Sequence, residues 1–456
     1  MSIRLILLLV LLAVPAVAQP IAAPDCTVEA DLASDLTLQV RYHCRTTGPL
    51  TFAPDGQRMG EHVSGLTVAG GEASYRFDLK SYARSVDSTS AAVLRGDGVL
   101  ATLSSWLLQP RGYERAPVID IRVRTADGLA FTSGLPKVGD AWRLAGTSVG
   151  FAGYTALGRF SLTEIVVPAP GSLRAGVARQ DGVLRLAILD GVSGVSGEEL
   201  VDWVRRTAEA ESNYWQGFTA KQLLVGLVPM AGKRGVGFGR TVSGGGATVM
   251  VEIGVDTERR RLFNDWVLVH ELVHTGMPYI GGRATWLMEG AATYVEPIIR
   301  ARAGWKTEEE VWMEWVKDMP QGAQAVAAGL QNASGRANYW AGATFMLLAD
   351  LGIRRTTNGS KGLEDCLGGA LWSGLDSPQR VGIAQYAAAC DKATGTTVVS
   401  DLIERHFARA EPVDLTALWT ELGVSRVGGR IALDDTAPQA QWRKMIVFGN
   451  KTAKRV

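Results

Sequence analysis

Two histidines and two glutamates in one short part of the chain are spaced as a metal site requires. His270 and His274 are four residues apart, so on a helix both imidazoles lie on one face and can point at a single ion. Neutral imidazole nitrogen is a suitable zinc ligand. Glu271 would project near the open position of that ion, where it can take a proton from an activated water and later return one to a leaving group. The alternative is a buried helix with two hydrogen-bonded histidines, but histidine occurs only five times in 456 residues.

A catalytic zinc usually has three protein ligands, and Glu289 is the candidate for the third. Thr285 can cap a second helix, which would put Glu289 about one turn from its start. The chain between His274 and Glu289 is long enough for a turn and an antiparallel return. A surface glutamate is the alternative, although the neighbours of Glu289 are mostly apolar. The sequence thus predicts one zinc ion per chain. Glu296 lies two helical turns after Glu289, where it would support a ligating histidine or form a surface ion pair.

These segments also carry a family resemblance. His270-Glu271-Leu272-Val273-His274 and the stretch 286–294 resemble the gluzincin metallopeptidases, nearest to the glycyl aminopeptidase family and the aminopeptidase N superfamily. Tyr339-Trp340-Ala341-Gly342 is similar to their Tyr-x-Lys-Gly stretch, with Ala341 in the place of the lysine. The resemblance implies a zinc metallopeptidase in which Tyr339 donates a hydrogen bond to the oxyanion of the tetrahedral intermediate. Taken alone, Tyr339 could equally be a core aromatic at a helix start.

The chain departs from these families in ways that bear on its substrate. A glycine-rich stretch occupies the place of their glycine-rich strand entry, but it has no acid to bind a substrate α-amine, so strict aminopeptidase action does not follow. An edge strand there could pair with an extended peptide, and an ordinary turn and strand is an equal alternative. The candidate substrate-binding residues are Gly244, Gly245, Gly246 and Ala247. The glycyl aminopeptidase family often has a C-terminal PDZ domain, for which the residues after Leu422 are too few.

The expected fold class is α+β with several domains, because hydrophobic patterns change along the chain. Residues 19–170 are β-rich, and alternating runs predict strands such as 36–42, 118–123 and 160–167. Residues 171–302 are mixed, and residues 303–456 are helical. The mixed region is expected to contain a helix at 197–214, strands at 183–189, 223–228 and 247–253, and a glycine-rich loop at 232–246. The resemblance implies an N-terminal β-sandwich, a thermolysin-like catalytic domain and a C-terminal helical domain.

Helices are predicted throughout the last region. Thr307 and Glu310 form a capping box before an apolar run. Further helices are expected at 339–351, 363–371, 378–390, 398–407 and 415–422, followed by a short tail after Gly429.

The first residues and the cysteines both indicate export. Residues 1–18 combine a positive start, an apolar run and a small-residue cleavage site, which predicts a removed signal peptide rather than a membrane anchor. The mature chain is then expected in the periplasm or outside the cell, with no membrane span. Two local disulfides are the simplest of three possible pairings in an oxidising compartment. The pairs are Cys26–Cys44 and Cys366–Cys390.

The composition argues against nucleic acid as a partner. The formal net charge is +1, and no basic stretch suggests nucleic-acid binding. The function predicted is hydrolysis of peptide bonds in peptide or protein substrates, with Glu271 as general base and then acid. The alternative is a non-catalytic zinc protein that binds peptides, and hydrolysis of another bond is a third hypothesis.

Overall fold

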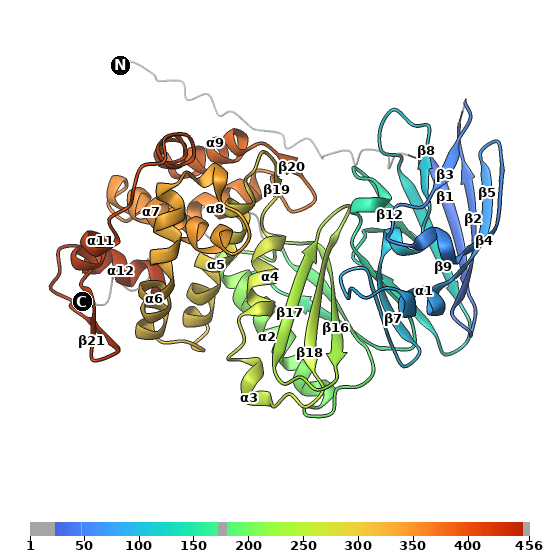
Figure 1. Cartoon of the computed structure of the whole chain (residues 1–456), viewed down its shortest axis with the longest axis horizontal. Coiled ribbons are helices and arrows are strands. Elements are labelled where there is room, and N and C mark those ends of the chain that lie inside the picture. Colours follow the sequence, from blue (N-terminus) through green and yellow to red (C-terminus); the bar gives the residue numbers. More distant parts are fainter. Residues whose placement is uncertain (1–22, 47, 172–179, 450–456) are drawn as a thin grey trace, which may run out of the picture.

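The computed structural model describes residues 23–46, 48–171 and 180–449. Within them the chain is mixed α/β, with several sheets followed by a long series of helices (Figure 1). The N-terminal sheets lie at one end of an elongated molecule, another sheet lies in the middle, and most helices lie at the other end. The expected signal peptide at residues 1–18 falls outside the described residues.

Two large sheets build the N-terminal part. Its elements are β1 (Cys26–Leu32), β2 (Thr37–Cys44), β3 (Thr51–Ala53), β4 (Val63–Ala69), β5 (Glu72–Asp78), α1 (Leu79–Ser85), β6 (Ala92–Arg95), β7 (Gly98–Thr102), β8 (Gln109–Arg111), β9 (Ile119–Thr125), β10 (Ala130–Ser133), β11 (Lys137–Val138), β12 (Ala141–Leu144) and β13 (Tyr154–Gly158). One sheet has the order β11-β12-β9-β1-β2-β5-β4, and the other has the order β10-β13-β7-β6. Buried residues of both sheets, such as Val28 and Ala101, belong to one hydrophobic core. The strands predicted at 36–42 and 118–123 are confirmed as β2 and β9.

A five-stranded sheet forms the middle of the molecule. Its elements are β14 (Ser161–Val167), β15 (Gly182–Ile188), α2 (Gly197–Trp215), β16 (Gln222–Met230), β17 (Val236–Val242), β18 (Ala247–Gly254) and α3 (Arg259–Leu262). The strand order is β14-β15-β16-β18-β17, so β17 is an edge strand and β18 is internal. The boundary expected near residue 170 therefore falls within one sheet, because β14 pairs with β15 across it.

The loop predicted at residues 232–246 is wrong in its middle, because Val236–Val242 form strand β17. Glycines at 237 and 239 lower β-propensity, but pairing with β18 over six residue pairs outweighs that cost. The alternation of Val236, Phe238 and Val242 is the local signal that the glycines masked. Residues of β17 line the cleft of the candidate active site.

The middle sheet is covered on both faces. One face packs against the N-terminal part, where Leu100 and Tyr154 meet Leu224 and Met250 in a shared cluster. The other face carries α2 and the helix α4 (Val267–Thr275), whose Leu268 and Leu272 lie in the core of the sheet. Packing of α4 on this face fixes the helix that carries both histidines.

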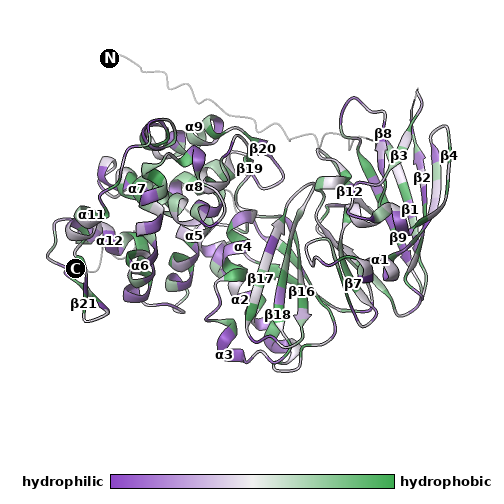
Figure 2. Cartoon of the chain, viewed as in Figure 1, coloured by the Kyte–Doolittle hydropathy of each residue, from purple (hydrophilic) through white to green (hydrophobic). Residues whose placement is uncertain are grey.

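The C-terminal part is helical. Its elements are β19 (Tyr279–Ile280), α5 (Thr285–Arg302), α6 (Glu308–Ala327), α7 (Ala337–Thr356), α8 (Leu363–Trp372), β20 (Arg380–Val381), α9 (Ile383–Thr394), α10 (Val398–Ile403), α11 (Leu415–Leu422), β21 (Val424–Val427), β22 (Arg430–Leu433) and α12 (Ala440–Phe448). The capping box of Thr307 and Glu310 is confirmed at the start of α6. The helix predicted from residue 378 starts later, because Arg380 and Val381 pair with β19 instead. Figure 2 shows hydrophobic residues concentrated on α7 and α8 and on the central strand β16.

Both predicted disulfides are confirmed. Cys26 and Cys44 join β1 to β2, with Cα atoms 4.0 Å apart, and Cys366 and Cys390 join α8 to α9, with Cα atoms 4.2 Å apart. None of the helices in the described ranges combines the length and the apolar run that crossing a membrane requires.

Candidate active site

The helix α4 holds both histidines because it is apolar almost all round. Leu268 and Leu272 face the middle sheet, while Val269 and Val273 face the helical core. The helix stops at Gly276, where a Cβ would lie 2.6 Å from the ring of Trp215. His270 is buried and His274 is half-buried, and their rings lie 4.9 Å apart between centroids. The buried setting leaves the two imidazoles on one face of a fixed helix.

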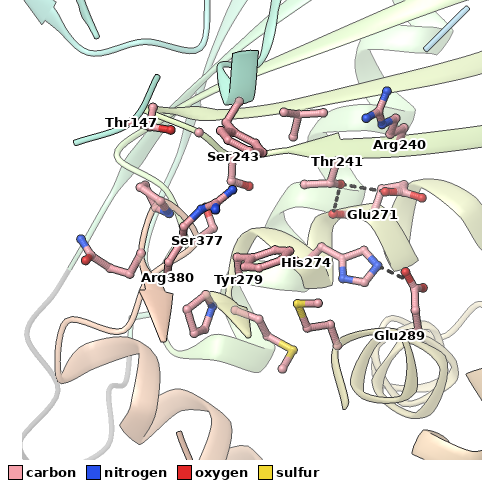
Figure 3. Close-up of a pocket in the computed structure, with 18 of the residues that line it drawn as sticks. Thr147, Arg240, Thr241, Ser243, Glu271, His274, Tyr279, Glu289, Ser377 and Arg380 are labelled. Atoms are coloured by element: carbon pink, nitrogen blue, oxygen red, sulfur yellow. Dashed lines mark hydrogen bonds and ion pairs between the residues drawn. The ribbon is translucent and has the colours of Figure 1, made fainter. Parts of the chain in front are cut away.

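The helix α5 brings the third candidate ligand to this face. Glu289 lies in its second turn and approaches both imidazoles. Its Oε2 is 3.3 Å from Nε2 of His270 and 3.5 Å from Nε2 of His274. Figure 3 marks the contact with His274. The capping role expected for Thr285 is wrong, because Thr285 is the first helical residue and Ala284 stands at the N-cap without a side-chain cap.

The spacing of these three donor atoms fits zinc. Four ligands at tetrahedral angles and about 2.0–2.1 Å from a zinc ion lie about 3.3–3.4 Å from one another. Both distances measured to Glu289 are close to this value. One ligand atom from each of the three residues lies within 4.8 Å of the other two. The residues predicted as a ligand set therefore come together, and their chemistry of two imidazoles and one carboxylate suits that metal.

The electrostatics of the cluster keep the carboxylate ionised. Burial alone would raise the pKa of Glu289, but hydrogen bonds and charge from His270 and His274 outweigh burial and hold it well below its ordinary value. The reverse effect acts on His274, where burial lowers the pKa and the carboxylates of Glu289 and Glu271 together raise it by more. An ionised carboxylate beside two imidazoles is the state that a cation needs in its ligands.

Glu271 contacts strand β17 through Thr241. The hydroxyl of Thr241 lies 2.7 Å from Oε2 of Glu271 and 2.7 Å from its backbone carbonyl oxygen, and it can donate its one proton to either. The next residue but one on the strand, Gly239, makes this approach possible. A Cβ at Gly239 would lie 2.5 Å from Cγ of Glu271 and 2.7 Å from Cγ1 of Val267. The strand thus fixes the carboxylate through one hydroxyl and one missing side chain.

Tyr339 lies in the first turn of α7, beside the cluster. Its ring stacks on His270 with centroids 5.8 Å apart and planes 20° apart. Burial, followed by the charges of Glu289 and Glu271, raises the pKa of Tyr339 to about 12, so the phenol keeps its proton at neutral pH. The hydroxyl is therefore available as a hydrogen-bond donor.

Two glycines set the distance between Tyr339 and Glu289. The helices α5 and α7 approach so closely that a Cβ at Gly290 would lie 2.2 Å from the backbone of Gly342. A Cβ at Gly342 would lie 1.8 Å from the carbonyl oxygen of Trp286. Gly290 directly follows Glu289, and Gly342 lies about one turn after Tyr339. The close crossing of the two helices therefore brings their functional side chains to the same place.

An open cleft of about 700 Å³ runs past the cluster. This volume lies in the range of roughly 300–1,000 Å³ that is usual for ligand sites. Glu271, His274, Glu289 and Tyr339 line it on the helical side, and residues of β17 line it on the other side (Figure 3). The cleft gives the cluster access to solvent and to a ligand of several residues.

Only part of the predicted substrate-binding stretch reaches this cleft. Gly244 lines it, whereas Gly245, Gly246 and Ala247 do not. A Cβ at Gly246 would lie 2.3 Å from the carbonyl oxygen of Gly134 in the N-terminal part. The glycines after Gly244 thus serve close packing between two parts of the chain, and the strand that borders the cleft is β17.

The expectation for Glu296 is also corrected. Its carboxylate pairs with Arg300 at 2.7 Å and is buried rather than exposed, and no described contact joins it to either histidine. Burial raises the pKa of Glu296 to about 7, although Arg300 opposes the shift. Thr241, Gly239 and Arg380 are residues of the site that no sequence pattern predicted, because the first two lay in a predicted loop and the third in a predicted helix.

Comparisons with known proteins give structural likeness without sequence likeness. No protein-family model and no curated protein matches the sequence. The chain is similar in structure to an M1 zinc metallopeptidase from Deinococcus radiodurans, with a TM-score of 0.46 and 14% identity over 85% of this chain and 95% of that one. It is also similar to yeast LTA4 hydrolase, with a TM-score of 0.46 and 11% identity over 87% of this chain and 71% of the other. The likeness to Legionella pneumophila aminopeptidase A has a TM-score of 0.46 and 9% identity over 85% of this chain and 50% of that one. With scores and identities this low, the function has to be argued from the site itself.

Proposed function

We propose that this protein is an exported zinc-dependent peptidase of the gluzincin type. The observation that carries the proposal is the spacing of three donor atoms, His270 Nε2, His274 Nε2 and Glu289 Oε2, beside an open cleft. The separations of 3.3 and 3.5 Å match two edges of a zinc coordination tetrahedron. A carboxylate that can act as base, Glu271, lies next to the first ligand and lines the same cleft.

One zinc ion per chain would be held by His270, His274 and Glu289. When bound, it would polarise the scissile carbonyl and lower the pKa of the attacking water to about 7. The ionised state of Glu289 supports this role, because a protonated carboxyl group is a poor ligand.

Glu271 acts as general base and then as general acid. Its carboxylate accepts the proton of the attacking water and later delivers it to the nitrogen of the departing amine. The hydroxyl of Thr241 restrains that carboxylate, since a donor at 2.7 Å limits rotation of the side chain. Proton transfer requires this restraint because donor and acceptor must lie within hydrogen-bond reach.

Tyr339 stabilises the oxyanion. The phenol is protonated at neutral pH, lines the cleft and lies beside the ligand His270. A neutral donor aimed at developing negative charge lowers the barrier of acyl transfer, and removal of one such donor costs about 10²-fold or more in kcat.

The substrate would lie as an extended peptide along β17. This strand pairs with β18 on one side only, and its residues from Phe238 to Val242 line the cleft. An open strand edge can hydrogen-bond the backbone of a peptide whatever its side chains are. Gly244 at the end of the strand would take part, and the two glycines after it would not.

The proposal also includes a division of the chain into domains and a compartment for the protein. We divide the sequence into a signal peptide at residues 1–18, a β-sandwich, a thermolysin-like catalytic domain that extends to residue 302, and a helical domain at 303–456. The boundary expected at residue 170 moves to a point before β14, because this strand belongs to the middle sheet. The two disulfides are compatible with an oxidising compartment such as the periplasm or the extracellular space.

The test is the substitution Glu271→Gln. The variant keeps the shape of the side chain and all three ligands, so we expect stoichiometric zinc in both proteins and loss of nearly all turnover in the variant. Zinc is measured by elemental analysis, and cleavage by mass spectrometry with a mixed peptide library. Stoichiometric zinc without cleavage by the parent would instead support a peptide-binding zinc protein, and undiminished cleavage by the variant would exclude the mechanism.

A further inference from the structure

At the end of the cleft away from Glu289, one cation is held between two aromatic rings. The guanidinium of Arg380 lies 4.1 Å from the ring centre of Phe151 and 4.8 Å from that of Tyr279. All three side chains line the cleft. Figure 3 shows Arg380 and Tyr279 on one side of the view, next to Ser243 and Ser377, and Glu271 and Glu289 on the other side.

The backbone that carries Arg380 is fixed. The amide of Tyr279 donates to the carbonyl oxygen of Gln379 at 2.9 Å, and the amide of Gly281 donates to that of Val381 at 3.0 Å. These bonds join β20 to the segment that directly follows the histidine helix. Phe151 comes from the N-terminal part, so three distant segments converge on one guanidinium. This side chain is therefore positioned before any ligand arrives.

The charge of Arg380 is unpaired within the part of the chain that the structure describes. Among the described residues, no carboxylate lies within ion-pair distance of its guanidinium and no acceptor receives a hydrogen bond from it. The guanidinium carbon lies over both rings, and the five N–H groups of a guanidinium project from its edges. Arg380 is exposed to the cleft, whereas Arg354 and Arg443 are buried and have carboxylate partners. Arg380 thus offers an unused planar donor set to whatever occupies the cleft.

The other charges of the cleft favour an anion at this end. Glu271 and Glu289 are the two carboxylates that line it within the described residues. Glu289 belongs to the metal cluster, and Glu271 directly follows the candidate ligand His270 in the chain. The second cation in the lining is Arg240, whose Nη1 donates to the carbonyl oxygen of Ser90 at 3.0 Å. A substrate ammonium group near Arg380 would meet a like charge and no acid, whereas a carboxylate would meet the fork of donors.

We propose that Arg380 determines specificity by binding a carboxylate of the peptide substrate. The carboxylate belongs either to an aspartate or glutamate side chain or to the C-terminus, since both present the same two oxygens. This proposal rests on the proposed peptidase function, because that function makes the ligand a peptide substrate. Binding and cleavage are measured separately to test it.

The experiment measures binding to zinc-loaded Glu271→Gln protein, which should hold peptides without cutting them. Pools of fluorescent hexapeptides carry either glutamate or glutamine at one fixed position, and a second set carries either a free or an amidated C-terminus. We expect one of the two acid forms to bind about tenfold more tightly than its neutral counterpart, as a charge-assisted bidentate pair allows. A preference for glutamate over glutamine would assign the carboxylate to a side chain, and a preference for the free over the amidated C-terminus would assign it to the C-terminus.

Arg380→Met is then added to the Glu271→Gln background. It keeps an apolar side chain between the two rings and removes the charge, so the preference for the acid form should disappear while the neutral pools bind nearly as before. Arg380→Lys should recover only part of it, because lysine lacks the planar fork. In the otherwise native enzyme, Arg380→Met should raise KM for the acid form by about tenfold and change kcat little.

Arg430→Met is the matched control, because Arg430 is exposed on β22 and its loss changes the net charge equally. Equal binding of acid and neutral pools, or a preference that survives Arg380→Met, would overturn the proposal. So would an equal loss in Arg430→Met or a loss confined to Arg240→Met. If the parent cleaves no peptide but the acid preference depends on Arg380, the peptidase function fails and the carboxylate site stands.

Discussion

The two walls of the cleft divide the work of the site. The helical wall, formed by α4, α5 and α7, contributes both imidazoles, both carboxylates and the phenol. The opposite wall, formed by β17, contributes a hydroxyl and a strand edge, and β20 at the far end of the cleft contributes a guanidinium. Reactive groups are thus concentrated on buried helices that other helices hold in place. The strand wall supplies the surface that a substrate would touch.

Glycine sets the distances in both walls, but with different consequences. Gly290 and Gly342 let two helices of one wall cross closely, and Gly239 lets the strand wall approach Glu271. The missing side chains of the two helical glycines bring Glu289 and Tyr339 of the helical wall together. The missing side chain of Gly239 lets the strand wall position Glu271, which belongs to the helical wall. The comparison predicts that the helical wall controls metal binding, while the strand wall controls turnover without affecting the metal.

The largest expected effect follows from Glu289→Gln in the helical wall. The amide removes the negative charge that both imidazoles face, so zinc affinity should fall by at least about 100-fold, since residues that only support ligands already cost 10–100-fold. Zinc affinity is measured by competition with a chromogenic chelator. Glu296→Gln is the control on the same helix, because Glu296 pairs with Arg300 rather than with a histidine. Equal zinc affinity in Glu289→Gln and the parent would remove Glu289 from the ligand set.

A smaller effect is expected from Gly239→Ala in the strand wall. The added methyl group would lie 2.5 Å from Cγ of Glu271, so the carboxylate or the strand must shift. A displacement of about 1 Å can cost about 10²-fold in rate, and we expect that loss in kcat with zinc content unchanged. Gly237→Ala is the control on the same strand, because its nearest atom, an oxygen of Glu252, lies 3.9 Å away. If both variants lose kcat equally, β17 tolerates no alanine and does not act through Glu271.

The smallest effect concerns the stability of the core behind the helical wall. Glu211 of α2 is buried, with Oε2 accepting from Trp215 Nε1 at 3.0 Å and Oε1 without a hydrogen-bond partner among the described residues. Burial first, and the charge of Glu296 in addition, raise the pKa of Glu211 well above its ordinary value of 4.5. A folded state that binds this proton more tightly is most stable below pH 4.5 and loses that stability as pH rises through the raised pKa.

Glu211→Gln should remove part of this pH dependence. The amide keeps an oxygen for Trp215 and carries no charge beside Glu296 and its partner Arg300. We expect its Tm at pH 8 to exceed that of the parent by on the order of 2–4 °C, and the difference to shrink at pH 5. Calorimetry at both pH values measures the effect. Glu209→Gln, half-buried on the same helix, is the control, and the same pH-dependent gain there would assign the effect to net charge.

Local patterns predicted the helical wall well. The apolar run around His270 and His274 required a buried helix, and the spacing of the two histidines then required a shared face. The strand wall was predicted poorly, because the glycines that permit close approach also weaken the local signal for a strand. Arg380 was placed in a helix for a similar reason, since pairing with β19, a partner about a hundred residues away in sequence, is not encoded nearby.

The candidate ligands, the neighbouring base and the two disulfide pairs could be predicted from local sequence, because each depends on residues close together in the chain. Which distant segments meet these residues depends on the folded arrangement. It brought Tyr339 to the histidines through a crossing of two helices, Thr241 to the base through an edge strand, and Arg380 to the far end of the cleft. Such contacts depend on packing between distant segments, whose free energy is spread over many residues and leaves no short pattern to recognise.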